Sequence, residues 1–147
     1  MKKKDRLEII LQLTKNHQIE TQEELQHLLA HEGVLATQST LSRDIRELQL
    51  IKERSVNGQL IYKAPPTKEE NALAGAMHDY GLSVARAQFM VVVKTNLATA
   101  DILANIIDDM DAQDILGTVA GADTLMIICQ DEKTALAWET MLQKLID

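Results

Sequence analysis

The stretch QSTLSRDIREL, residues 38–48, places polar and apolar side chains at helical spacing. At about 3.6 residues per turn, Leu41, Ile45 and Leu48 fall on one side of a helix. The other side carries two guanidinium groups and two short hydroxyls, those of Ser39, Ser42, Arg43 and Arg46. Such groups suit phosphates and base edges, although for a helix considered alone an ordinary solvated face is the favoured interpretation. The neighbouring elements decide between these interpretations.

Two helices are predicted before this stretch. Apolar residues at helical spacing predict the first over residues 4–14. Thr21 and Glu24 have the capping-box spacing that begins a second helix, over residues 22–31. Gly33 fits the cap at its end. The stretch 38–48 is therefore the third helix.

The third helix, with Thr37 as a suitable N-cap, is followed by a predicted hairpin. Two strand-like runs in LIKERSVNGQLIYKA, residues 50–64, flank Asn57-Gly58, a strong hairpin signal. Three helices and a hairpin make a winged helix-turn-helix. In this motif the last helix enters the major groove of DNA and the hairpin, or wing, lies against the backbone or minor groove.

The charges around the third helix fit DNA binding. Arg43 and Arg46 suit guanine edges. Asp44 and Glu47 are expected to point to the flanks of the helix, where they limit non-specific binding without cancelling its basic face. Further basic residues are expected to add phosphate contacts, namely Lys2–Lys4, Lys52, Arg54 and Lys63.

A polar stretch, residues 65–71, is predicted to link two domains, residues 1–64 and residues 72–147. Residues 1–70 contain 11 Lys and Arg against 11 Asp and Glu, whereas residues 71–147 contain 4 against 11. The second part thus carries the whole formal charge of −7. This asymmetry indicates two units with different partners.

The second domain is predicted to mix helices and strands. A helix from Asn71 to about Tyr80, a central helix around Leu103 and a C-terminal helix around Trp138 separate short strand-like runs. The apolar run Phe89–Val93 is typical of a strand covered on both faces. The expected fold class is α+β, a winged helix-turn-helix followed by a small α/β domain with an antiparallel sheet. The high apolar content of the second domain predicts that part of its surface is buried between subunits.

Several classes of protein are excluded by what the sequence lacks. It has no Gly-rich phosphate loop, Cys and His cluster or nucleophile motif, so we expect neither an enzyme nor a cofactor or metal site. One cysteine, Cys129, excludes an intrachain disulfide. No apolar run reaches the roughly 20 residues that span a bilayer, so no membrane partner and a cytoplasmic location are expected.

Two separate motifs resemble the bacterial arginine repressor family. STLSRDIREL, residues 39–48, is similar to that family's recognition helix, which carries a Ser-Arg pair in the same setting. ILGTVAGADTLMIIC, residues 115–129, resembles its Gly-Thr-hydrophobic-x-Gly-Asp-Asp-Thr segment. The resemblance covers nearly the whole chain. It implies a hexamer of two trimers, L-arginine bound between the trimers, and paired DNA operators near genes of arginine biosynthesis or catabolism.

The resemblance also implies roles for individual residues. Ser42 and Arg43 match the family's base-reading pair, and Asp123 matches the second Asp of its Asp-Asp pair. Asp108 matches an acidic position on the preceding helix. The remaining expected DNA contacts lie beside the base-reading pair, namely Gln38, Ser39, Thr40 and Arg46.

The sequence departs from the family's pattern in three places. Ala122 replaces the first Asp of the pair, and Leu97-Ala98 stands where Pro-Gly is usual. Asp101 stands where Gln or His is common at the arginine site. A buried cationic ligand needs paired carboxylates, so Asp101 either restores the missing charge or belongs to a solvated acidic rim. The other members of such a rim would be Asp108, Asp109, Asp111 and Asp114.

Two alternative functions remain compatible with the sequence. One is a subunit with weak or no arginine binding that acts in mixed oligomers with a related repressor. The other is an architectural DNA-binding factor without an effector. Ala122 is the residue that separates these alternatives from an arginine-responsive regulator.

Overall fold

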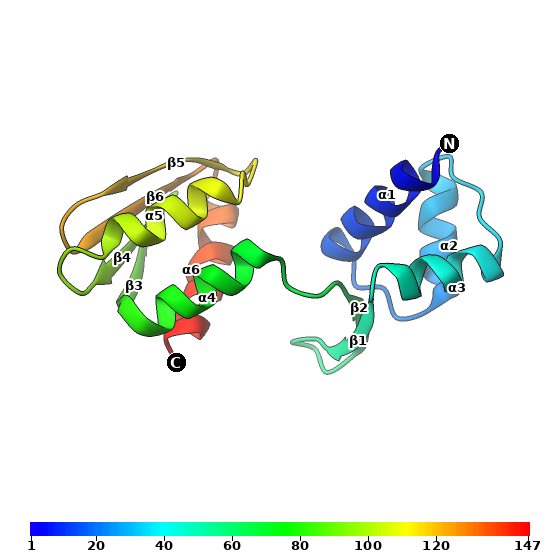
Figure 1. The fold of residues 1–147 in the computed structure, drawn as a ribbon, viewed down its shortest axis with the longest axis horizontal. Coiled ribbons are helices and arrows are strands. Elements are labelled where there is room, and N and C mark those ends of the chain that lie inside the picture. Colours follow the sequence, from blue (N-terminus) through cyan, green and yellow to red (C-terminus); the bar gives the residue numbers. More distant parts are fainter. The chain divides into compact units, whose positions relative to one another are not determined.

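In the computed structural model, which describes residues 1–147, the chain divides into two units, Met1–Pro65 and Pro66–Asp147 (Figure 1). Unit 1 contains three helices followed by an antiparallel hairpin. Its elements are α1 (Lys3–Asn16), α2 (Gln22–His31), α3 (Gln38–Glu47), β1 (Ile51–Arg54) and β2 (Leu60–Lys63). This order confirms the predicted winged helix-turn-helix.

Local sequence explains where α2 begins and ends. The Thr21 hydroxyl accepts a hydrogen bond from the backbone N–H of Glu24, as predicted. The reciprocal bond differs, because the Glu24 carboxylate accepts from the N–H of Glu20 instead of that of Thr21. At the other end Gly33 has φ +78°, and Gly33 and Val34 donate back to carbonyls of the last turn. The chain thereby turns sharply into α3.

The apolar side of α3 packs into the core of unit 1. Leu41 and Ile45 are buried and Leu48 is half-buried, as their spacing predicts. The hairpin joins the same core through Tyr62, whose N–H donates to the carbonyl of Ile19. The buried cluster comprises Ile10, Leu13, Ile19, Leu25, Leu29, Val34, Leu41, Ile45, Leu50 and Tyr62. One core therefore fixes both α3 and the wing.

The wing loop contains the predicted Asn57-Gly58 turn. Gly58 has φ +81°, a conformation that glycine adopts without strain. The N–H of Ser55 donates to the carbonyl of Gln59 at 2.7 Å and closes the loop.

Unit 2 is an antiparallel sheet with three helices. Its elements are α4 (Lys68–Tyr80), β3 (Gly81–Ala87), β4 (Met90–Thr95), α5 (Ala100–Asp109), β5 (Ile115–Ala120), β6 (Thr124–Cys129) and α6 (Glu132–Ile146). The strand order is β3-β4-β6-β5, with every neighbouring pair antiparallel. The α+β expectation is confirmed. None of the helices has the length and apolar character that crossing a bilayer requires.

Helix α4 begins earlier than its apolar pattern predicts. A full capping box forms between Thr67 and Glu70, so the helix starts at Lys68 rather than near Asn71. Residues 68–71, which the sequence analysis assigns to the linker, are thus helical. The T-x-x-E signal was present in the sequence.

The two faces of the sheet differ. Val91 and Val93 on β4, and Leu125 and Ile127 on β6, are buried in one core with α4, α5 and α6. Successive residues of a strand point to opposite faces, so the residues between them lie on the other face. That face, which we call the open face, includes Met90, Val92, Val119, Met126 and Ile128.

The open face is apolar but is not covered within the chain. Met90, Val92, Met126 and Ile128 are half-buried, and Val119 is 59% exposed. The expectation that Phe89–Val93 is a strand covered on both faces is therefore wrong for the single chain. Phe89 itself lies in the β3–β4 turn and is 44% exposed. All three helices pack on the opposite face, so none remains for this one.

Replacing Leu41 by Ala should destabilise the chain by about 2–5 kcal/mol, because it leaves a cavity under α3. Leu41 is fully buried, whereas Leu35 is 91% exposed, so Leu35→Ala is the matched control and should change stability by less than about 0.5 kcal/mol. Urea unfolding followed by circular dichroism measures both. Equal effects of the two substitutions would contradict the assigned core.

Candidate functional site

The side of α3 opposite its core contacts is polar and accessible. Gln38, Ser39, Arg43 and Arg46 are exposed, while Thr40 and Ser42 are half-buried. All six residues predicted to contact DNA thus belong to one helix, none of them is buried, and neither arginine forms an ion pair within the chain.

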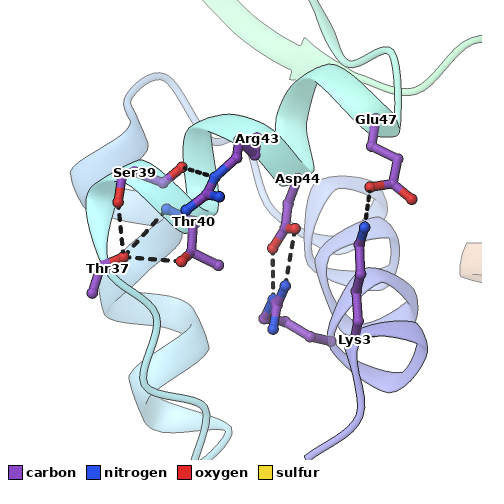
Figure 2. Close-up of polar contacts among 8 residues, drawn as sticks. Lys3, Thr37, Ser39, Thr40, Arg43, Asp44 and Glu47 are labelled. Carbon is purple, nitrogen blue, oxygen red and sulfur yellow. Dashed lines mark hydrogen bonds and ion pairs between the residues drawn. The ribbon is translucent and has the colours of Figure 1, made fainter.

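Hydroxyl groups are ordered around the start of α3 (Figure 2). The Thr37 hydroxyl accepts from the N–H of Thr40 at 3.2 Å, as the predicted N-cap, and lies 3.2 Å from the Ser39 hydroxyl. The Arg43 Nε donates to the carbonyl of Ser39 at 3.3 Å. This bond holds the root of the guanidinium group. The two terminal nitrogens of Arg43 keep the fork geometry that suits guanine or phosphate.

The sequence predicts that Asp44 points to the flank of α3, but this prediction is wrong. Asp44 is 2% exposed and forms two hydrogen bonds with Arg6 of α1 (Figure 2). Arg6 Nε donates to Oδ2 at 2.6 Å and Nη2 donates to Oδ1 at 3.0 Å. The hydrogen bond to Asp44 raises the pKa of the Arg6 guanidinium above its ordinary value, so Arg6 stays protonated.

Glu47, one turn further along α3, is also matched by a cation of α1. Lys3 Nζ lies 2.6 Å from a Glu47 carboxylate oxygen, and both side chains are about half exposed or more, at 60% and 49%. Both acidic residues of α3 are therefore paired with α1. Arg43 and Arg46 remain as the unpaired charges of the helix.

The wing contributes cations on both of its faces. Lys52 Nζ lies 5.1 Å from the ring centroid of Tyr62, and Arg54 donates to the carbonyl of Gly58 at 2.8 Å. Lys52 and Arg54 share one face of β1 because they are two residues apart. Lys63 pairs with Ile51 and so lies on the other face. The wing cations thus do not form one surface.

The three acidic residues predicted to bind the effector are all exposed, and two of them lie at opposite ends of α5. Asp101 is in the first turn of α5 and Asp108 is in its last turn, which separates them by about 10 Å along the helix axis. Asp108 accepts a hydrogen bond from the Thr118 hydroxyl of β5 at 2.8 Å. Asp123 lies in the β5–β6 turn. No three His, Cys, Asp or Glu residues in the structure are grouped so as to hold a metal ion.

Asp123 is held by its neighbours. Its side chain accepts from the Thr124 hydroxyl at 3.0 Å, and Lys94 Nζ donates to that hydroxyl oxygen at 2.7 Å. Its carbonyl accepts from the N–H of Thr95 at 2.9 Å. Asp123 is therefore anchored to β4 through both its backbone and its side chain.

The structure brings together two departures that are far apart in sequence. The N–H of Ala98 donates to the carbonyl of Ala122 at 2.6 Å, so the loop before α5 lies against the β5–β6 turn. Sequence reasoning missed this contact, because residues 24 positions apart give no periodic signal. Together with Asp101 and Asp123, these two alanines define the candidate effector site.

Ala98 adopts a backbone conformation that disfavours side chains. Its φ is +64°, in the left-handed region where a Cβ costs about 1–3 kcal/mol. The position suits glycine, which is usual there in the family that the sequence resembles. In this conformation the N–H of Ala98 donates to the carbonyl of Ala122. The strained loop therefore lies within the candidate site.

Replacing Ala98 by Gly should stabilise unit 2 by about 1 kcal/mol, because the relief of strain exceeds the added flexibility of the unfolded chain. Ala85→Gly is the control, since Ala85 lies in β3 without a positive φ and should lose stability. Thermal unfolding monitored through Trp138 fluorescence, which reports on the unit 2 core, measures both. A lower unfolding temperature for Ala98→Gly than for the wild type would contradict the inferred backbone strain at Ala98.

Comparisons with known proteins agree with both units. The family model described as arginine repressor, DNA binding domain, matches residues 1–70. The one described as arginine repressor, C-terminal domain, matches residues 77–144. These two matches cover most of the chain.

Curated relatives resemble nearly the whole chain. The arginine repressor of Streptococcus equi subsp. zooepidemicus is 45% identical over 139 residues, which are 95% of each chain. That of Streptococcus pyogenes serotype M6 is 44% identical over 144 residues, again 95% of each. That of Lactococcus lactis subsp. lactis is 46% identical over 140 residues, 92% of this chain and 91% of the relative. The chain belongs to the arginine repressor family and to transcription regulators rather than enzymes.

Proposed function

We propose that the chain is a DNA-binding transcriptional regulator of arginine metabolism genes that responds to L-arginine and acts as an oligomer. Residues 1–64 bind double-stranded operator DNA, and residues 72–147 form the oligomer and bind L-arginine. The observation that carries the proposal is the accessible face of α3, with Arg43 and Arg46 unpaired above a buried apolar side. Such a function places the chain in the cytoplasm, and its relatives' name indicates repression.

The DNA contacts follow from the chemistry of α3. Arg43 and Arg46 offer guanidinium forks to guanine edges or phosphates, and Ser42 directly precedes Arg43 in the sequence as a short donor. The polar groups at the N-terminus of the helix, those of Gln38, Ser39 and Thr40, suit neighbouring phosphates. The wing adds Lys52 and Arg54 from one face.

Replacing Arg43 by Ala should weaken binding to a specific site by about 1–3 kcal/mol, or roughly fivefold to 150-fold. The probe is a duplex that the wild-type chain enriches from a random-sequence pool, here called the selected duplex, with a shuffled duplex for comparison. Gel-shift titration gives both affinities.

Lys15→Ala is the matched control, because it removes the same charge from an exposed position of α1. It should leave the preference for the selected duplex unchanged. Unaltered affinity of Arg43→Ala for the selected duplex would remove Arg43 from the readout.

The open face of unit 2 supports assembly with further copies of the chain. Val92 pairs with Met126, and Met90 pairs with Ile128, so four apolar side chains adjoin in the middle of this face. A domain of about 75 residues has a small interior, and an apolar sheet face of this kind is typical of a subunit interface. We infer that trimers form through this face and pair into hexamers, as the family resemblance implies.

L-arginine is the proposed effector, because its guanidinium and α-amino groups are cations that carboxylates recognise. Asp101 and Asp123 flank the contact between Ala98 and Ala122, and Asp108 lies further along α5. Assembly of several copies would supply each carboxylate more than once. The loss of one carboxylate at Ala122 weakens the site by a few kcal/mol, or about a hundredfold, unless Asp101 compensates.

Replacing Ala122 by Asp should tighten L-arginine binding by up to about a hundredfold and make binding to the selected duplex more dependent on arginine. Ala122→Asn is the control, because it has similar size without the charge. Isothermal titration calorimetry and gel shifts across arginine concentrations measure the two effects. Tight binding by the wild type that Ala122→Asp does not improve would show that Asp101 or another group already replaces the lost carboxylate.

The same titration tests a second candidate function, which Ala122 itself favours. If the wild-type chain binds no arginine alone, it acts in mixed oligomers with a related repressor that carries the full Asp-Asp pair. An effector shifts DNA binding only by its differential affinity for two states, so the partner's sites would then supply the response.

A further inference from the structure

We propose that Arg6 of α1 is a positioning residue for DNA readout, because its ion pair with Asp44 fixes the rotation of α3 about its own axis. The inference rests on the proposed DNA-binding function and adds to it a residue that does not touch DNA. It concerns how Arg43 and Arg46 are presented rather than which bases they read.

The geometry of the pair restricts both partners. Two parallel hydrogen bonds, at 2.6 and 3.0 Å, hold the planar guanidinium of Arg6 against the planar carboxylate of Asp44. Such a fork permits fewer orientations than a single contact with a lysine would. The residues are 38 positions apart, so the bonds join α1 directly to α3.

The burial of the pair means that its charges must be matched. Asp44 is 2% exposed and Arg6 is 19% exposed, and no other cation is paired with Asp44. Apolar residues of similar size commonly stabilise a protein as well as a buried ion pair does. The feature that apolar packing does not reproduce is a directional bond that selects one orientation of the helix.

Orientation matters here because Arg43 directly precedes Asp44. Successive helical residues are about 100° apart around the axis, so any rotation that displaces Asp44 displaces the exposed Arg43 equally. Side chains reach about 5–6 Å from the axis, so a 20° rotation moves them by about 2 Å. Hydrogen bonds to base edges do not tolerate such a displacement.

A second ion pair joins the same two helices and provides a matched control. Lys3 and Glu47 lie one turn away on α1 and α3, but their side chains are 60% and 49% exposed. Exposed pairs of this kind contribute little and restrict orientation weakly. Loss of Lys3 should therefore leave α3 in place.

The test compares full-length wild type with Arg6→Met/Asp44→Leu, which replaces the pair by apolar side chains, and with Lys3→Met. Circular dichroism melting measures the fold, and gel-shift titration measures affinity for the selected and shuffled duplexes. We expect the double variant to melt at or above the wild-type temperature. It should bind the selected duplex about tenfold more weakly and the shuffled duplex almost unchanged. Lys3→Met also removes an expected phosphate contact, so it should weaken binding to both duplexes alike and keep the wild-type ratio of the two affinities.

Two outcomes would overturn the inference. A folded double variant that keeps the wild-type preference would show that the pair is only structural. An equal loss of preference in Lys3→Met would show that any ion pair between α1 and α3 has this effect, so that the buried fork is not what positions the helix. If the double variant does not fold, Arg6→Lys replaces it, since it keeps the charge, loses the fork and should show the same loss of preference. A wild-type chain that enriches no duplex would instead refute the proposed DNA binding, and with it this inference.

Discussion

The sheet of unit 2 has two apolar faces but helices for only one of them. The helices α4, α5 and α6 bury Val91 and Val93, while the open face around Val92 and Met126 stays half exposed. Because no helix of the chain covers the open face, we infer that further copies of the chain pack against it. This packing is the proposed role of unit 2 in assembly. Assembly would also gather several copies of α3 in one particle, so that modest contacts by each copy add up to strong binding of paired operator sites. It would bring the candidate effector sites of different copies into the same assembly.

Electrostatics explain how an acidic chain can present a surface for DNA. The formal charge is −7, and α3 itself carries as many acids as arginines. Asp44 forms an ion pair with Arg6, and Glu47 forms one with Lys3. The negative charges of α3 are therefore paired with cations of α1, and Arg43 and Arg46 are left unpaired. The remaining negative charge belongs largely to unit 2, where it suits a cationic effector. The division of charge along the chain thus fits the two proposed binding functions, a polyanion at one unit and a cation at the other.

Periodicity and capping signals predicted most elements, because these are local properties of the chain. The boundaries of α2 and α3 and the hairpin around Gly58 agree with the structure. The start of α4 was misplaced although its capping signal was present. The role of Asp44 was missed because its partner is 38 residues away, although Asp44 lies at the edge of the buried arc of the helix that Leu41 and Ile45 form. The contact between Ala98 and Ala122 depends on loop geometry, which no local pattern encodes.

The oligomeric state of the full-length chain tests the central claim most directly, because it asks whether copies of the chain cover the open face. Sedimentation equilibrium at micromolar concentration, with and without L-arginine, measures the particle mass. The account predicts three or six times the mass of one chain, and a shift toward six when arginine is present at saturating concentration. A folded particle with the mass of a single chain under both conditions would contradict it.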